Sequence, residues 1–254
     1  MIYVPEDGHI LNNIKKYSVW AGEEVDFLTS RYREIILKYP EEMITFIDAG
    51  AHCGLVTRQF ILNTGFKGRA TLVEPVPQHV VAIRKNMGSI GNPSNFEIIE
   101  AALGRTEGHF KIFKESNNSG NSSLLRSLVP LAGSTEVQVK VIASEDFSNI
   151  FSQKTEVILL KSDLQGFDAQ VLANFSDQFW QKLDSAVIEV LANPSIETKD
   201  VDIIIKRLNT YSYKSWKPGQ KSMSTSAEIR EFWLSKTGLQ RNLYIAKETN
   251  FVTI

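Results

Sequence analysis

The chain passes from a strand through a tight turn into a helix over residues 47–54, Ile47-Asp48-Ala49-Gly50-Ala51-His52-Cys53-Gly54. An apolar strand, Ile44–Asp48, leads into the turn, and a helix is predicted over Leu55–Leu62. Neither Gly50 nor Gly54 carries a Cβ atom, so the backbone there can pass very close to a ligand. The N–H groups at the start of the helix attract negative charge. A strand, a glycine turn and a helix in this order predict a nucleotide-like cofactor at the carboxyl end of a parallel sheet.

A second acidic residue indicates which cofactor. The next apolar run, Ala70–Glu74, places Glu74 one helix and one strand beyond Asp48, where an acid suits a ribose whose hydroxyls donate hydrogen bonds. The turn reads Gly-x-x-x-Gly rather than the Gly-x-Gly-x-x-Gly of dinucleotide binders, so it does not predict a pyrophosphate clamp. A mononucleoside with an amino-acid tail, S-adenosylmethionine, fits better.

A third strand, Phe96–Glu100, leaves through two small residues. Ala101 and Ala102 would leave room for a flat adenine ring beside the backbone, although small residues at a strand end do not by themselves require a ligand. Asp48 is expected to orient the amino-acid end of the cofactor, and His52 to shape the turn. The predicted cofactor-binding residues are Asp48, Gly50, His52, Gly54, Glu74, Pro75, Ala101, Ala102 and Asp163.

The fourth strand, Val157–Asp163, carries a second group of polar side chains. Lys161 and Asp163 are two positions apart, so both face the same side of the sheet at its carboxyl end. The alternative is a surface Lys–Asp pair, which usually contributes little. Glu189, late in the fifth strand, is expected to join Asp163, where two carboxylates can orient a hydroxyl, act as a base, or hold a divalent metal. The predicted catalytic residues are Asp163, Lys161 and Glu189, with Asp163 and Glu189 as the ligands if a metal binds.

Strands and helices alternate from Ile44 onward, which predicts a mostly parallel sheet in one α/β domain over residues 43–254. Residues 1–42 precede it as a helical extension, in which an amphipathic helix, Glu23–Leu37, either pads the sheet or lies over the cofactor cleft. The remaining predicted elements are the strands Asp184–Val190, Tyr211–Ser215 and Asn242–Ala246, the helices Pro77–Met87 and Asp168–Phe175, and a helix that includes Ile203–Leu208.

One region breaks the alternation. Gly108–Phe113 and Val137–Ile142 both alternate with period two and predict a β-hairpin-like excursion. The polar stretch Ser116–Ser123 lies between them. Long connections inside compact domains are usually functional or disordered, so we expect this one to lie near the site.

The bulk composition disfavours several classes of function. The formal net charge is −1, with 28 basic and 29 acidic residues, so no basic excess points to nucleic acid. The single cysteine, Cys53, excludes an internal disulfide and fits a reducing compartment. No apolar run reaches the length of a membrane span, and we expect a cytoplasmic protein with a small-molecule substrate. Homo-oligomer formation is left open.

No histidine pair has metal-ligand spacing, and His79 is expected to face solvent on its helix.

Together these residues resemble the FkbM family of S-adenosylmethionine-dependent methyltransferases. The resemblance spans roughly residues 44–192 and its motifs occur in order. They are Phe46–Gly54, Val73–Pro77, Ala101–Gly104, Asn121–Leu124 and Leu160–Asp168.

The resemblance implies a Rossmann-like class I methyltransferase fold, with a seven-stranded, mostly parallel sheet whose last strand is antiparallel. It also implies O-methylation, often of sugars or other hydroxylated natural products. Lys161 and Asp163 would then lie beside the transferred methyl group. The residues that carry over as cofactor contacts are Asp48, Gly50, Gly54 and Glu74.

The chain departs from the family pattern at several positions. The family usually has an apolar residue where Ser162 stands, and often Asn and Glu where His52 and Gln165 stand. A histidine commonly follows the acid of the fifth strand, whereas Val190 follows Glu189 here. These differences concern the substrate class and any metal more than the cofactor.

The sequence therefore predicts an S-adenosylmethionine-dependent O-methyltransferase that acts on a sugar, nucleotide sugar or glycan precursor, phosphorylated or not. Asp163 is the predicted base, and Lys161 holds its charge and a group of the substrate; an anionic acceptor would need no base. The alternatives are an NAD-dependent oxidoreductase, which the missing third glycine disfavours, and a non-catalytic interaction module of the same fold. A nucleic-acid methyltransferase is disfavoured because an Asn-Pro-Pro-Tyr motif and a basic excess are both missing.

Overall fold

The computed structural model describes residues 2–4, 10–12, 14, 20–91, 95–115, 120, 122–130, 133–191, 193, 195–217, 225–235 and 240–248. Within them, seven strands form one sheet in the order β10-β11-β9-β8-β1-β2-β3. Neighbouring strands are parallel except at β11, which runs antiparallel to β9 and β10. This confirms the predicted mostly parallel sheet with an antiparallel last strand. The strands are β1 (Ile44–Ala49), β2 (Arg69–Val73), β3 (Phe96–Ile99), β8 (Val157–Ser162), β9 (Leu183–Leu191), β10 (Tyr213–Trp216) and β11 (Gln240–Lys247).

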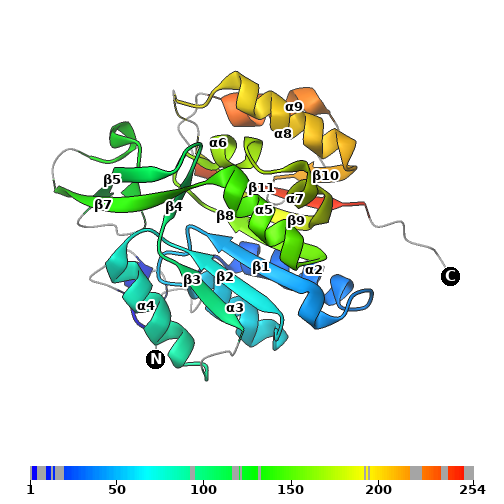
Figure 1. Cartoon of the computed structure of the whole chain (residues 1–254), viewed down its shortest axis with the longest axis horizontal. Helices are drawn as coiled ribbons and strands as arrows, with labels where there is room; N and C mark the ends of the chain where they lie inside the picture. Colours follow the sequence, from blue (N-terminus) through cyan, green and yellow to red (C-terminus); the bar gives the residue numbers. More distant parts are fainter. Residues whose placement is uncertain are drawn as a thin grey trace.

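Helices cover both faces of this sheet, so the domain has three layers (Figure 1). Because side chains alternate along a strand, Phe46 of β1 packs into one layer and Ile47 into the other. Each buried side chain of this size contributes about 1.5–3 kcal/mol to folding. The first layer holds α2 (Gly22–Ile35), α3 (Leu55–Thr64) and α4 (Pro77–Gly88), and the second holds α5 (Ser144–Lys154), α6 (Asp168–Ala173), α7 (Asp177–Lys182), α8 (Thr198–Thr210) and α9 (Ser226–Leu234).

Local sequence signals account for several helix ends. Pro77 stands at the start of α4, where its fixed backbone angle suits a helix and its missing N–H is not needed. Gly65 ends α3 in the left-handed conformation with φ 68°, which glycine adopts without the cost of a Cβ atom. Thr225 and Glu228 form a reciprocal capping box at the start of α9.

A smaller, four-stranded sheet in the order β4-β7-β5-β6 arises from the residues predicted as a β-hairpin-like excursion. Its long strands, β5 (Gly108–Glu115) and β7 (Ser134–Ala143), are antiparallel as predicted. The sequence did not predict its short strands, β4 (Ala102–Gly104) and β6 (Ser122–Ser123). Residues 116–119 and Asn121, in the polar connection, lie outside the described residues.

Part of the N-terminal segment is fastened to the turn that follows β1. The side-chain amide of Asn86, on α4, accepts a hydrogen bond from the N–H of Tyr3 at 2.7 Å. It donates to the carbonyl oxygens of Tyr3 and Cys53, both at 2.8 Å. Val4 and Ile10 are buried in a small apolar cluster that includes Cys53. The described residues before α2 therefore pack on α4 and the turn.

Predicted and observed bounds differ most beside turns. Helix α2 ends at Ile35, two residues before the predicted Leu37. The strand predicted over Tyr211–Ser215 begins only at Tyr213, because Ser212 has a φ of 56° in the turn after α8. Helices α5, between β7 and β8, and α7, between α6 and β9, were not predicted.

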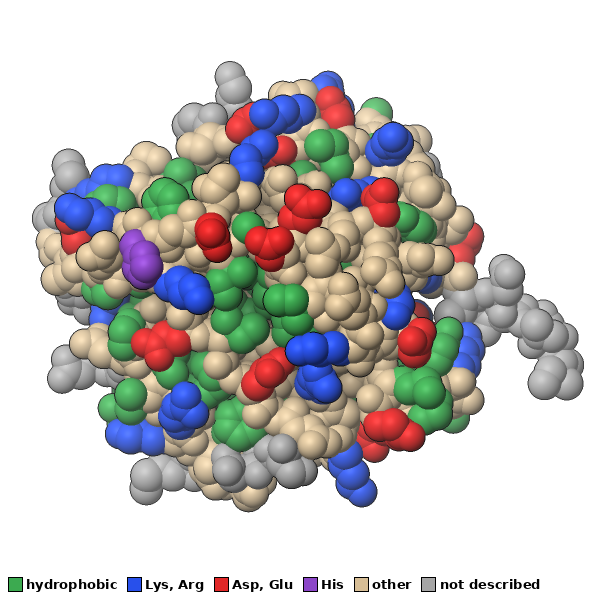
Figure 2. Space-filling view, in the orientation of Figure 1, with side chains coloured by type: hydrophobic (Ala, Val, Ile, Leu, Met, Phe, Trp, Pro, Cys, Tyr) green, Lys and Arg blue, Asp and Glu red, His purple; other side chains and the backbone are tan. Residues whose placement is uncertain are grey.

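Charged side chains are mixed over the surface. On the face shown in Figure 2, acidic and basic side chains are interspersed, in keeping with 28 basic and 29 acidic residues in the chain. Of the helices that the structure describes, none combines the length and apolar character needed to cross a membrane.

Candidate active site

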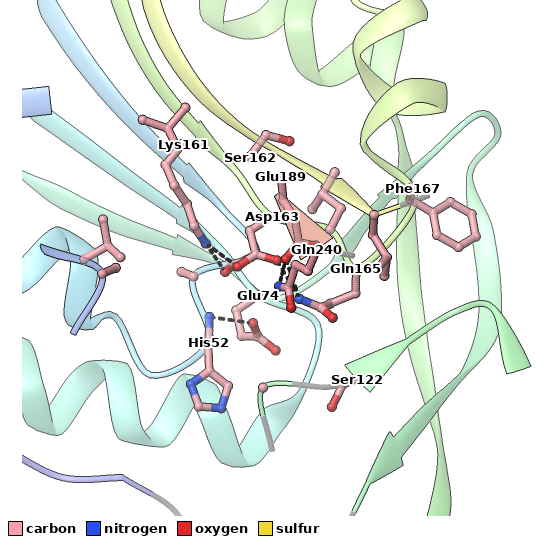
Figure 3. Close-up of a pocket in the computed structure, with 18 of the residues that line it drawn as sticks. His52, Glu74, Ser122, Lys161, Ser162, Asp163, Gln165, Phe167, Glu189 and Gln240 are labelled. Carbon is pink, nitrogen blue, oxygen red and sulfur yellow. Dashed lines mark hydrogen bonds and ion pairs between the residues drawn. The ribbon is translucent and has the colours of Figure 1, made fainter. Parts of the chain in front are cut away.

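The candidate active site is a cavity of about 1560 Å³ at the carboxyl ends of the central strands. Single ligand pockets usually measure about 300–1,000 Å³, so this cavity has room for two ligands. The turn after β1 and Glu74 form one wall, which we name the donor wall. Asp163, Glu189 and the start of β11 form the opposite wall, the acceptor wall (Figure 3). Of the predicted site residues, Gly50, His52, Glu74, Pro75, Ala101, Ala102, Lys161, Asp163 and Glu189 line the cavity, whereas Asp48 and Gly54 lie behind it.

The glycine turn is shaped by contacts within the protein. Gly50 has a φ of +76°, and a Cβ atom there would lie 1.8 Å from the carbonyl oxygen of Asp163. Gly54 has a φ of +74°, and a Cβ atom there would lie 3.3 Å from a side-chain atom of Leu72. The sequence argument explained both glycines by the approach of a ligand. The structure adds a second reason, because the backbone just after β8 approaches Gly50 and Leu72 of β2 approaches Gly54.

Glu74 follows β2, and three donors hold its carboxylate. Oε2 accepts a hydrogen bond from the backbone N–H of His52 at 2.8 Å. Oε1 accepts one from the backbone N–H of Val76 at 2.9 Å and lies 3.0 Å from Nδ1 of His79. Glu74 is only 4% exposed. Its carboxylate is therefore fixed in orientation at the edge of the donor wall.

The prediction that His79 faces solvent is wrong. His79 is 1% exposed, and its ring meets the ring of His52 edge-on, with 4.2 Å between centroids. Because Pro77 begins α4 only three residues after Glu74, the first turn of the helix folds back over the carboxylate. The five-residue spacing from Glu74 to His79, with a helix start between them, was a sequence signal for this contact. Helical periodicity alone does not indicate that the two side chains meet.

Lys161 lies among oxygen acceptors. Its Nζ donates to the carbonyl oxygen of Gly50 at 2.6 Å, and it lies 3.2 Å from Oδ1 of Asp48 and 3.6 Å from Oδ2 of Asp163. Burial alone would lower the pKa of Lys161, but the charges of Asp48 and Asp163 outweigh it and hold the pKa above its usual value. Its Nζ thus combines a hydrogen bond to Gly50 with ion-pair contacts to Asp48 and Asp163. Lys161 therefore joins the turn after β1 to the end of β8.

Asp163, Gln165, Glu189 and Gln240 form a chain of hydrogen bonds along the acceptor wall (Figure 3). Nε2 of Gln165 donates to Oδ1 of Asp163 at 2.7 Å and to Oε1 of Glu189 at 3.2 Å. Gln240 donates to the same oxygen of Glu189. The side chain of Asp163 is 34% exposed, whereas Glu189 is 3% exposed. Asp163 is therefore the carboxylate presented to the cavity.

Burial raises the pKa of two acids near this wall, Glu189 and Asp168. Burial, followed by the charges of Asp163 and Asp168, raises the pKa of Glu189 well above its usual value. Burial also raises the pKa of Asp168 to about 7, although the hydroxyl of Ser162 donates a hydrogen bond to it at 2.6 Å. The raised pKa favours the protonated form of Glu189, whose Oε1 is joined to Asp163 through Gln165.

Sequence reasoning missed the contribution of β11 to the acceptor wall. Because β11 is antiparallel, its amino end, with Gln240 and Asn242, reaches the edge where the parallel strands end. The rule that ligands bind at carboxyl ends of strands does not point to such residues. Asn242 also donates to Glu24 at 2.6 Å, which brings the start of α2 to the cavity. Helix α2 packs on the sheet, as one predicted alternative had it, and its first residues, Gly22, Glu23 and Glu24, border the cavity.

Asp163 and Glu189 are the two residues that the sequence predicts as metal ligands. Among the residues that the structure describes, no three His, Cys, Asp or Glu side chains gather in a way that could hold a metal ion. Asp163 and Glu189 are instead bridged by the side-chain amide of Gln165.

Comparisons with known proteins agree with this arrangement. A family model described as the methyltransferase FkbM domain matches residues 48–215. Methyltransferase 1 from Beauveria bassiana (strain ARSEF 2860) is 24% identical over 224 residues, which is 75% of this chain and 88% of that protein.

Two solved structures are similar at low sequence identity. Methyltransferase FkbM from Methylobacillus flagellatus KT has 15% identity and a TM-score of 0.48, over 86% of this chain and 47% of that chain. Precorrin-6y C5,15-methyltransferase from Geobacter metallireducens GS-15 has 12% identity and a TM-score of 0.42, over 89% of this chain and 87% of that chain.

The family match covers more than half of the chain, from Asp48 in β1 to Ser215 in β10. It includes Glu74 on the donor wall and both Lys161 and Asp163 on the other side of the cavity. The order and directions of the seven strands are those of a Rossmann-like methyltransferase sheet. The chain therefore belongs to the FkbM family of methyltransferases.

Proposed function

We propose that the protein is an S-adenosylmethionine-dependent O-methyltransferase that acts on a hydroxylated small molecule, most directly a sugar, a nucleotide sugar or a glycan precursor. The observation that carries the proposal is the meeting of two different walls in one cavity. Glu74 is fixed on the donor wall and Asp163 is presented on the acceptor wall. The volume of about 1560 Å³ suits a methyl donor and an acceptor together.

The chemistry of the donor wall fits the cofactor. The carboxylate of Glu74 only accepts hydrogen bonds in its ionised form, and Oε2 has a lone-pair position besides the one that His52 uses. That position suits a ribose hydroxyl. Ala101 and Ala102 line the cavity with small side chains, which leaves space for a flat base. When bound, the cofactor supplies an electrophilic methyl group on a sulfonium sulfur.

The acceptor wall supplies the base in this proposal. Asp163 takes the proton of the acceptor hydroxyl at its exposed carboxylate, which makes the oxygen a better nucleophile. Lys161 remains charged and forms an ion pair with Asp163. Gln165, which also donates to Glu189, fixes the orientation of the Asp163 carboxylate. Alignment of the two reacting groups in one cavity contributes a large share of the acceleration.

At the place of transfer, the contacts of Lys161 favour a neutral hydroxyl over a phosphate group. Its Nζ already donates to Gly50 and forms ion pairs with Asp48 and Asp163, so its charge is shared between two carboxylates of the protein. A phosphate would also bring negative charge beside acidic groups of the acceptor side. The acidic residues that border the cavity there are Glu23, Glu24, Asp163 and Glu189.

Binding and transfer measured separately test the proposal. Calorimetry with S-adenosylhomocysteine should show binding to the wild-type protein, loss of binding in Glu74→Ala, and retained binding in Asp163→Ala. A labelled-methyl transfer screen across nucleotide sugars, glycans and small phosphate esters, with and without divalent metal, should identify an acceptor whose methylation Asp163→Ala abolishes. Equal loss of binding in both variants contradicts the division of roles. Binding of NADH in place of S-adenosylhomocysteine would indicate an oxidoreductase, and binding of neither would indicate a non-catalytic module.

A further inference from the structure

His79 and Glu74 form a buried pair at the donor wall. Nδ1 of His79 lies 3.0 Å from Oε1 of Glu74, and the two side chains are only 2% and 6% exposed. We propose that His79 is a positioning residue for the cofactor, which donates a hydrogen bond from Nδ1 to Glu74 and holds that carboxylate in the orientation that receives the ribose. This inference rests on the proposed function, because it assumes that Glu74 binds the cofactor.

Hydrogen-bond accounting indicates which ring nitrogen carries the proton. An ionised carboxylate only accepts hydrogen bonds, so Nδ1 of His79 must be the donor to Glu74. The other nitrogen, Nε2, is buried and has no hydrogen-bond partner within the described part of the chain. With the proton on Nδ1, Nε2 carries a lone pair, so no N–H donor of the ring is left buried without a partner. The pair is therefore consistent with one tautomer.

Of the three donors that the described residues supply to Glu74, only His79 can be removed by a substitution. The other two donors are the backbone N–H groups of His52 and Val76, which remain whatever side chains stand there. The terminal torsion of a glutamate side chain is broad, so its orientation depends on the donors around it. Without His79, Oε1 keeps a single donor and the carboxylate is free to turn.

The ring of His79 also supports the turn. It contacts the ring of His52 with 4.2 Å between centroids, and His52 has a positive φ of 50°, which is uncommon for a residue with a side chain. The same side chain thus touches both parts of the donor wall. Partners that orient a ligand-binding group in this way typically change affinity by about 10–100-fold when they are removed, as at metal sites.

Three substitutions distinguish a positioning role from simple packing. The amide nitrogen of an asparagine lies close to where Nδ1 of a histidine would be, whereas that of a glutamine lies close to Nε2. We therefore expect His79→Asn to bind S-adenosylhomocysteine within about threefold of wild type, and His79→Gln and His79→Leu to bind it about 10–100-fold more weakly. In turnover with an identified acceptor, the losses should appear in KM for the methyl donor, with kcat at saturation changed less than about twofold.

Met87→Ala is the matched control, because Met87 is fully buried on the same helix and far along it from Glu74. It should lower the melting temperature and leave the affinity for S-adenosylhomocysteine unchanged. Equal affinity of wild type, His79→Leu and His79→Gln would overturn the inference, as would an equal loss in His79→Asn and His79→Leu. If wild type itself does not bind S-adenosylhomocysteine, the proposed function fails instead.

Discussion

The carbonyl oxygen of Asp163 occupies the space that a side chain at Gly50 would need, since a Cβ atom there would lie 1.8 Å away. Two hydrogen bonds cross the same contact. The N–H of Asp163 donates to Ala49 at 3.0 Å, and Nζ of Lys161 donates to the carbonyl oxygen of Gly50 at 2.6 Å. The donor wall and the acceptor wall therefore meet through the backbone, and their spacing does not depend on a mobile loop.

This contact predicts an unequal response to two glycine substitutions. Gly50→Ala combines a left-handed residue, costing about 1–2 kcal/mol, with displacement of the end of β8. We expect a total loss of about 3 kcal/mol or more, or a fall in melting temperature of about 6–12 °C. Gly65 has a similar φ of +68° but no atom within 4 Å of a Cβ built there, so Gly65→Ala should show only the conformational cost. Equal melting temperatures for the two variants would rule out the contact as the constraint.

Replacing Lys161 should destabilise the protein strongly. Lys161→Met leaves Asp48, which is 0% exposed, without its cation, and breaking a buried ion pair from one side typically costs about 3–5 kcal/mol. Urea unfolding should show this loss, and Lys161→Met combined with Asp48→Asn should recover part of it. Lys111→Met is the surface control, because Lys111 and Glu136 are 67% and 52% exposed, and its urea midpoint should stay close to that of wild type.

Glu189 should tolerate replacement by a neutral amide better than loss of its side chain. Because burial raises the pKa of Glu189, the neutral acid is the form we expect beside Asp163. Glu189→Gln keeps a neutral group that can hydrogen-bond Asp163, so methyl transfer should fall less than about tenfold. Glu189→Ala leaves Gln165 and Gln240 without their shared acceptor, and transfer should fall about 100-fold or more, with S-adenosylhomocysteine binding retained. Activity lost equally in both variants would show that Glu189 works as an anion.

The raised pKa of Asp168 implies that the stability of the protein depends on pH. Its pKa is about 7 in the folded protein against 3.8 as a model value, so the folded state binds the proton more tightly than the unfolded chain. Stability should therefore fall as pH rises from about 4 to about 7 and then level off, by at most about 4 kcal/mol. Unfolding free energies of Asp168→Asn across this window should fall less than those of wild type. Parallel curves for the two proteins would contradict the assignment.

Asn86 predicts the behaviour of the N-terminal segment. Asn86→Ala removes two hydrogen bonds to Tyr3 and one to Cys53, each worth about 0.5–1.5 kcal/mol. Hydrogen exchange at the amide of Tyr3 should become faster in this variant. Lys85 lies over the ring of Tyr3 at 3.8 Å, and Lys85→Ala removes that contact while leaving the amide clamp. In Lys85→Ala, hydrogen exchange at the amide of Tyr3 should stay close to that of wild type. Equally faster exchange in both variants would contradict the role given to Asn86.

The sequence predicts the sheet and much of the cavity because the needed signals are local. Asp48, Glu74 and Asp163 each end an apolar run, and the carboxyl ends of parallel strands meet at one edge. The polar connection between β5 and β7 was expected near the site for its length alone, and Ser122 and Leu124 do line the cavity.

Features that depend on tertiary geometry were not predictable in this way. His79 lies under Glu74 because of how α4 leaves its strand, which hydropathy does not record. Gln240 reaches Glu189 because β11 enters the sheet antiparallel and in one register. Whether Gly50 makes room for a ligand or for Asp163 depends on a contact between segments more than 100 positions apart in the chain.

The place of β11 in the sheet also bears on how the chain folds. β11 lies between β9 and β10 but follows β9 by about fifty residues. Until it pairs, β9 is an edge strand, and its residues Ala186, Val187 and Ile188 are apolar ones that end almost fully buried. Exposed apolar edges of this kind promote pairing with other chains and aggregation. Pairing of β11 with β9 therefore covers an edge at which a newly made chain could associate with other chains. The same pairing brings Gln240 to Glu189 and completes the acceptor wall.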